Sequence, residues 1–216
     1  DFTEKQMTIV SLTSEFMSKY FNLSAIVLAG LPLSVIPKDA QRTHPAWNDK
    51  QVLTGYVLNN VLKPRLPEDA AACIAFTAFD LWPGEGWNFV FGQASLQDRV
   101  GVWSIYRNGN ADGTPEDFRL CLLRTMKTAT HETGHMFGME HCIAYECNMC
   151  GSNNRDEADR CPIQLCPECV AKVWWSTKSD PLARYCELAL FCEKQRLKPE
   201  QEFYQRLIDR LQPARN

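Results

Sequence analysis

Several features that would mark a membrane protein or a nucleic-acid-binding protein are missing from this sequence. No uninterrupted apolar run is long enough to span a bilayer, because the longest candidate, residues 23–36, is too short and contains Pro32. No stretch is dense in Lys and Arg, and the net charge is only -3. This balance argues against nucleic acid or an anionic membrane as a partner. We therefore expect a soluble protein that binds neither.

Internal repeats, low-complexity tracts and an initiating methionine are absent as well. The chain has 216 residues, which suits one large domain or two small lobes around a shared cleft. Apolar residues make up 45% and charged residues 23%, so the chain can bury a core without disulfides. Because the first residue is Asp1, we expect a processed or excised chain. A signal peptide could have been removed, so its absence does not indicate where the protein is located.

Hydrophobic periodicity predicts a mixed order of helices and strands. Apolar residues at helical spacing cover residues 4–21 and 48–63, and short apolar runs predict strands at residues 23–34, 71–82, 87–95 and 99–107.

A long helix should follow these elements. Thr114 is a suitable N-cap and Pro115 suits the first turn, so the helix should run from here to a stop at Gly138. An irregular, Cys-rich segment then extends to about Pro167. Two amphipathic helices are predicted near the end of the chain, at residues 182–194 and 199–211.

This order predicts an α/β (α+β) fold. Residues 1–138 would form an upper lobe with a mixed twisted sheet and the long helix, and residues 139–216 a small Cys-rich lower lobe with C-terminal helices. We expect the two lobes to make up a single catalytic domain, residues 1–216.

Histidine is scarce, yet three of the four histidines lie in the stretch "HETGHMFGMEHCIAYECNMC", residues 131–150. His131 and His135 would lie one helical turn apart on the same face, where both can reach one ion. If the helix continued, His141 would be roughly 80° away around the axis and about 15 Å further along. The chain must therefore turn between them, and Gly138 can adopt the left-handed conformation that ends a helix.

Three neutral imidazoles suit Zn²⁺ and leave its fourth position open for water, which is the design of a catalytic site. Zinc can lower the pKa of that water to about 7. Glu132 follows the first histidine and can take the proton, then deliver it to a leaving amine. The metal polarises the scissile carbonyl, so no Ser or Cys nucleophile is needed.

The cysteines predict a second site. Six of the ten crowd into residues 142–169, which indicates metal binding rather than disulfides in a chain that needs no stapling, although disulfides are the alternative. A reducing, cytoplasmic compartment follows from this interpretation. Spacing alone leaves two sets open: Cys147, Cys150, Cys166 and Cys169, or the same set with Cys142 in place of Cys150. Either would make a closed, structural zinc site.

This stretch resembles the archaemetzincins, metzincin-like zinc metallopeptidases. Their signature is HExxHxxG, three residues, Cys, four residues, Cys, one residue, Met, and a terminal CxxC. The matching residues here are His131, Glu132, His135, Gly138, Cys142, Cys147, Met149, Cys166 and Cys169. The similarity covers at least Trp87 to Cys169, and Cys150 and Cys161 depart from the signature.

The resemblance implies a metzincin-like fold with two zinc ions. The catalytic zinc would bind His131, His135 and His141, with Glu132 as the base and Met149 in the Met-turn beneath. The structural zinc would bind Cys142, Cys147, Cys166 and Cys169, which favours Cys142 over Cys150.

We therefore predict a monomeric zinc metallopeptidase that acts on a peptide or protein substrate. Residues 88–95 would be the edge strand along which the peptide lies. The residues do not separate aminopeptidase from endopeptidase action. Two alternatives are a non-catalytic, zinc-stabilised interaction module and a zinc amidohydrolase acting on small non-peptide substrates.

Overall fold

The computed structural model describes residues 2–212, and its chain divides into two compact units. The first unit contains the residues up to Val10 and Leu28–Gly138, and the second contains Ser11–Val27 and the chain from Met139 onward. The division after Gly138 coincides with the boundary expected from the sequence. Residues 11–27, however, group with the second unit rather than the first.

The first unit contains two small mixed sheets rather than one. The first sheet has the order β1 (Gln41–Thr43), β2 (Lys50–Leu53), β4 (Asp80–Trp82), and the second has the order β3 (Cys73–Thr77), β6 (Val100–Ser104), β5 (Gly92–Ser95). Within them β2 and β4 are parallel, as are β3 and β6, whereas β1 and β5 are antiparallel to their neighbours. The mixed α+β class is thus confirmed.

The core of the first unit lies between these strands and a short irregular helix. This helix consists of α2 (Thr54–Tyr56), the π-helical turns η3 (Val57–Leu62) and the 3₁₀ turn η4 (Lys63–Arg65). Further 3₁₀ turns are η1 (Leu33–Val35), η2 (Lys38–Ala40) and η5 (Tyr106–Asn108). The buried cluster comes from β2, η3, β4 and β6 and comprises Val52, Val57, Leu58, Val61, Leu62, Leu81, Val100 and Val102.

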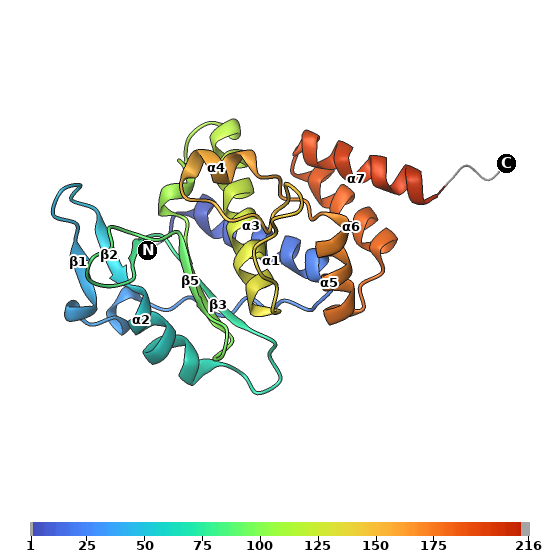
Figure 1. Ribbon diagram of the computed structural model, residues 1–216. Helices are drawn as coiled ribbons and strands as arrows, with labels where there is room; N and C mark the ends of the chain where they lie inside the picture. The colour runs from blue at the N-terminus through green and yellow to red at the C-terminus, as the bar shows by residue number, and fades with distance from the viewer. Residues whose placement is uncertain (1, 213–216) are drawn as a thin grey trace. The chain divides into compact units, whose positions relative to one another are not determined.

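Helix α3 (Pro115–Met136) completes the first unit and packs against β5 and β6 (Figure 1). Its start is a capping box: the Thr114 hydroxyl accepts the Asp117 N–H, and the Asp117 carboxylate accepts the Thr114 N–H. The last helical residue is Met136. Gly138, two residues further on, has a φ of 79°, which is the left-handed conformation expected after a helix end. The predicted start and stop are both confirmed.

The second unit is helical. It contains α4 (Arg155–Arg160), α5 (Pro167–Thr177), α6 (Pro181–Lys194) and α7 (Lys198–Leu211), together with the later part of α1 (Glu4–Phe21). Helices α6 and α7 form a hairpin, seen in orange and red in Figure 1. The segment predicted to be irregular up to about Pro167 is irregular over residues 139–150, but helix α4 interrupts it further on. Within residues 2–212, none of the helices combines the length and apolar character that crossing a bilayer requires.

Three predicted elements were wrong. In each case the outcome depends on whether the segment finds another strand to pair with, which its own sequence does not show. Residues 23–34 form no strand: Ile26 is 83% exposed and Leu28 61%, and no other strand pairs with them. Residues 71–82 are two strands in different sheets, separated by a turn in which the Phe79 N–H donates to the Thr77 hydroxyl. The first part of residues 48–63 is strand β2, because pairing with β1 and β4 overrides its helical pattern.

Candidate metal centres

Two of the predicted zinc ligands lie on the last turns of α3. The Nε2 atoms of His131 and His135 are 3.1 Å apart, and their rings meet at 89°. Two nitrogens bound to one tetrahedral zinc would be about 3.3 Å apart, given Zn–N bonds of about 2.0 Å. The two imidazoles therefore already have the spacing that a shared zinc ion requires.

The third histidine follows the turn at Gly138. The Gly138 N–H donates to the His135 carbonyl at 2.8 Å, which closes the helix and redirects the chain. His131, His135 and His141 form a group in which each offers one ring nitrogen, and these nitrogens lie within 4.8 Å of one another. The backbone of Gly151 lies against the His141 ring, since a Cβ there would be 3.1 Å from Nδ1.

Glu132 stands beside the first histidine on the same helix. Its side chain is partly buried. Burial raises the pKa of the Glu132 carboxyl, and the nearby His135 opposes this shift. A raised pKa makes the carboxylate a stronger base, which suits a group that accepts a proton and later returns it.

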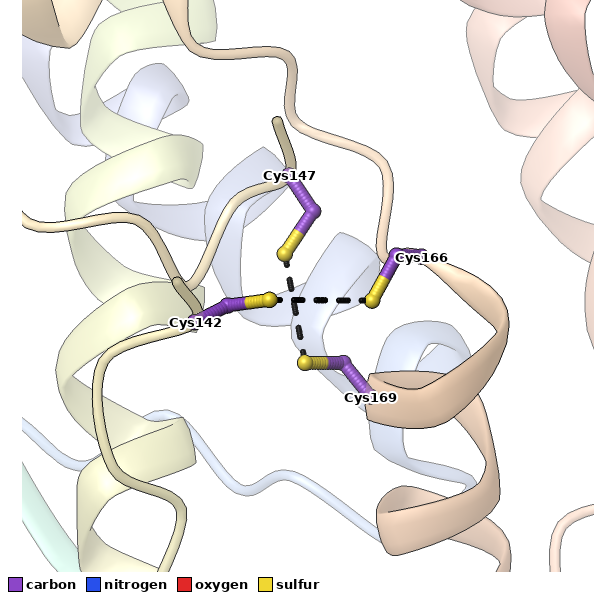
Figure 2. Close-up of side chains that lie close together, drawn as sticks. All are labelled: Cys142, Cys147, Cys166 and Cys169. Carbon is purple, nitrogen blue, oxygen red and sulfur yellow. Dashed lines mark hydrogen bonds between the residues drawn. The ribbon is translucent and has the colours of Figure 1, made fainter. Parts of the chain in front are cut away.

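Four cysteine side chains converge in the second unit. Figure 2 shows the sulfurs of Cys142, Cys147, Cys166 and Cys169 turned toward a common centre. The Sγ atoms of Cys142 and Cys166 are 3.9 Å apart, as are those of Cys147 and Cys169. Sulfurs on a tetrahedral zinc would be about 3.8 Å apart, given Zn–S bonds of about 2.3 Å. The four thiols therefore fit one zinc ion.

Backbone hydrogen bonds bring these four cysteines together. The Cys142 N–H donates to the carbonyl of the buried Met149 at 2.8 Å, and the Asn148 N–H donates to the Gln164 carbonyl at 2.9 Å. Cys166 is the N-cap of α5, and Cys169 lies in the first turn of that helix. The first pair of cysteines thus comes from a loop and the second pair from a helix start.

The thiols differ in how readily they ionise. Burial opposes ionisation of Cys142, but hydrogen bonds from the backbone of Ala144 and Tyr145 and from neighbouring thiols lower its pKa to about 7. Burial raises the pKa of Cys147 to about 11 and also raises that of Cys169. Thiolates this close together repel one another, so a divalent cation is needed before all four can ionise.

The structure groups Cys142, rather than Cys150, with the other three cysteines. The Cys150 sulfur instead accepts the Cys147 N–H at 3.3 Å and donates to the Tyr145 carbonyl at 3.0 Å. None of the ten cysteines, all of which lie among the described residues, forms a disulfide, so the disulfide alternative finds no support.

Sequence reasoning did not single out two buried residues of the second unit that contact each other, one of which also bonds to the segment leading to Cys166. Tyr20 of α1 is fully buried, and its hydroxyl donates to the Ile163 carbonyl at 3.0 Å. Arg184 of α6 is also buried and lies over the Tyr20 ring. Nothing in the sequence indicated either role, because an aromatic residue on the apolar face of a helix is usually an ordinary core residue.

Comparison with known proteins agrees with this chemistry. Peptidase family M54 matches residues 71–174. Archaemetzincin-2 of Homo sapiens is 36% identical over 200 residues, which cover 81% of this chain and 55% of that protein. Archaemetzincin of Thermococcus kodakarensis is 34% identical over 167 residues, which cover 76% of this chain and 88% of that protein. The chain thus spans about half the length of the human relative and most of the archaeal one.

Solved structures show the same fold. The crystal structure of archaemetzincin from Methanopyrus kandleri matches with a TM-score of 0.61 and 29% identity, covering 83% of this chain and 91% of that one. Archaemetzincin from Archaeoglobus fulgidus, crystallised in complex with malonate, matches with a TM-score of 0.57 and 28% identity, covering 76% and 92%. With two groups of candidate metal ligands in place and an archaeal relative matched over most of its length, the chain belongs to the archaemetzincin family, peptidase family M54.

Proposed function

We propose that this chain is a zinc-dependent metallopeptidase whose catalytic zinc binds His131, His135 and His141. The observation that carries the proposal is the convergence of three histidine nitrogens within 4.8 Å, with Glu132 next to the first of them. Membership of a peptidase family supports the same conclusion. Met149 would supply an apolar floor, as the family resemblance implies.

Glu132 would be the general base. When bound, zinc polarises the scissile carbonyl and lowers the pKa of a water molecule. A carboxylate oxygen of Glu132 would take a proton from the attacking water and then pass it to the nitrogen of the leaving amine. The water oxygen would add to the carbonyl carbon as its proton leaves, and the C–N bond would break as the leaving nitrogen receives that proton, which releases the new amino terminus.

Strand β5 would orient the substrate. It lies at the end of the β3–β6–β5 sheet and packs against α3, the helix that carries His131 and His135. One edge of β5 therefore pairs with no other strand among the described residues, and an extended peptide could pair there with the backbone of Gly92–Ser95. Backbone pairing would align the scissile bond without selecting a particular sequence.

The cysteine group would hold a second, structural zinc, because four thiolates close the coordination sphere and leave no position for substrate. We therefore propose two zinc ions per chain. The cysteines must be reduced to bind the metal, which favours a reducing compartment such as the cytoplasm. Both ligand groups are complete within one chain, so we propose that the monomer is active, which sedimentation analysis of the active protein would check.

The variant Glu132→Gln tests the proposal most directly. It should retain both metals, by elemental analysis, and lose peptide hydrolysis by about 10²- to 10⁴-fold, because only the base is removed. Hydrolysis would be measured by mass spectrometry on a peptide library that contains free and acetylated amino termini. Cleavage of acetylated peptides would identify an endopeptidase, and cleavage of free peptides alone an aminopeptidase.

Glu116→Gln is the matched control, since Glu116 is an exposed acid in the first turn of the same helix. It should hydrolyse peptides at the wild-type rate. Undiminished peptide turnover by Glu132→Gln would refute the mechanism. Wild-type protein with no peptide turnover would favour the interaction module or, if small amides are hydrolysed, the amidohydrolase.

A further inference from the structure

Arg184 is an unusual residue in the second unit. It is only 3% exposed, and its Nη1 and Nη2 atoms have no hydrogen-bond partner among the residues that the structure describes. Its Nε donates to the Tyr20 carbonyl at 2.7 Å, so a backbone oxygen rather than a carboxylate holds it. A buried guanidinium is always charged and costs free energy unless an opposite charge offsets it. The source of that opposite charge requires an explanation.

Tyr20 connects Arg184 with the cysteine group. The guanidinium carbon of Arg184 lies 4.4 Å from the centre of the Tyr20 ring. The hydroxyl at the other end of the ring donates to the Ile163 carbonyl and is also hydrogen-bonded with the side chain of Asn148. Asn148 directly follows Cys147, and Ile163 lies three residues before Cys166. One phenol therefore ties together the two segments that carry the cysteines.

The charges of the two groups are complementary. Zinc bound by four thiolates carries a net charge of about −2, because four negative charges outweigh one divalent cation. Cys147, Cys166 and Cys169 are all buried, so water screens this charge poorly. Burial is the main cause that raises the pKa of the Tyr20 hydroxyl; the charge of Arg184 opposes this shift, and the charge of Cys147 adds to it, so both charges act on the same hydroxyl.

We propose that Tyr20 and Arg184 are positioning residues of the four-cysteine zinc site. Tyr20 holds the two cysteine-bearing segments in register through its hydroxyl, and Arg184 supplies the buried positive charge that offsets the zinc–thiolate group. This inference rests on the structural zinc of the proposed function. It explains why an arginine is buried in α6 without a carboxylate.

Tyr20→Phe is the first test, because it removes one hydroxyl and keeps the ring. Loss of a partner in the shell around a metal site typically weakens metal binding about 10- to 100-fold. We expect zinc to pass from Tyr20→Phe to a chromogenic chelator faster than from wild type by a factor in that range. Tyr204→Phe is the matched control, because the Tyr204 hydroxyl is buried in the same unit without a partner. It should release zinc at the wild-type rate.

The second test removes or keeps the positive charge at position 184. Arg184→Met should release zinc faster than wild type, whereas Arg184→Lys should restore much of the wild-type rate because it keeps the positive charge. Arg206→Met, at an exposed position on α7, controls for loss of an arginine in this unit. Circular dichroism would check that each variant is folded.

Cobalt substitution assigns the effect to the cysteine site. Thiolate-to-cobalt charge transfer absorbs strongly, whereas histidine ligands give no such band, so the titration reports the cysteine site alone. Weaker cobalt binding in Tyr20→Phe and Arg184→Met supports the inference. Binding equal to wild type in both variants overturns it and leaves the proposed function intact. A wild-type protein without the charge-transfer band overturns both this inference and the second zinc.

Discussion

At the scale of single residues, Gly101 and Trp103 show how close packing supports the proposed substrate strand. Both lie on β6, two residues apart and so on the same face, and the Trp103 indole covers the Gly101 backbone. A Cβ at Gly101 would lie 1.8 Å from the ring, and Trp103 is fully buried. Only glycine leaves room for the indole here. Strand β6 in turn pairs with β5 along Val100–Trp103.

Gly101→Ala should therefore destabilise the protein by about 1–3 kcal/mol, because the buried indole must shift to admit a methyl group. Urea-induced unfolding followed by tryptophan fluorescence would measure the change. Gly30→Ala is the control, since no atom lies within 4 Å of its Cβ position, and it should alter stability by less than about 0.5 kcal/mol. Equal effects of the two substitutions would show that the indole does not restrict residue 101.

At the scale of elements, the two long helices α1 and α3 followed the sequence, whereas the strands followed it only in part. Helix α1 has the predicted bounds, Glu4–Phe21, and α3 begins after the predicted cap at Thr114. Both depend on signals within a few residues of one another, namely apolar spacing and capping. Residues 23–34 contain residues that favour strands, yet they find no partner strand. Pairing over long sequence separations is not encoded locally, so this prediction failed.

Thr114→Ala should lower the free energy of unfolding by about 1 kcal/mol, because it leaves the N–H of Asp117 without its side-chain acceptor. The histidines lie near the opposite end of α3, so zinc content should not change. Thr8→Ala is the control: Thr8 is an exposed threonine within a helix, and its hydroxyl donates a hydrogen bond to the Glu4 carbonyl of the preceding turn. Chemical denaturation should show little or no loss for this control. A loss as large as that of Thr114→Ala would argue against the capping box as the cause.

At the scale of the whole molecule, we propose that the two ligand groups have different tasks, one catalytic and one structural. The cysteine group lies within the second unit and joins a loop to the start of α5, so metal binding there should contribute directly to folding. The histidine group begins on α3, whose cap and packing against β5 and β6 hold it without metal. Loss of either metal should thus have a distinct consequence.

Cys169→Ser and His135→Ala should separate the two metals. Each variant should bind one zinc per chain instead of two, by elemental analysis. Cys169→Ser should also lose on the order of 3 kcal/mol of stability, because the energy of structural zinc binding is folding energy. His135→Ala should lose hydrolysis but little stability in thermal unfolding. Two zinc ions in Cys169→Ser, or the same loss of stability in both variants, would contradict this division of tasks.

The candidate histidine site could be recognised from the local sequence alone. His131, Glu132 and His135 are adjacent through helix geometry alone, and Gly138 must break the helix if His141 is to approach them. Tertiary structure decided what spacing left open: that Cys142 rather than Cys150 joins the cysteine group, and that Tyr20 and Arg184 lie behind it. Relations within one or two helical turns follow from backbone geometry, whereas the choice among equally spaced thiols and distant partners depends on how the whole chain packs.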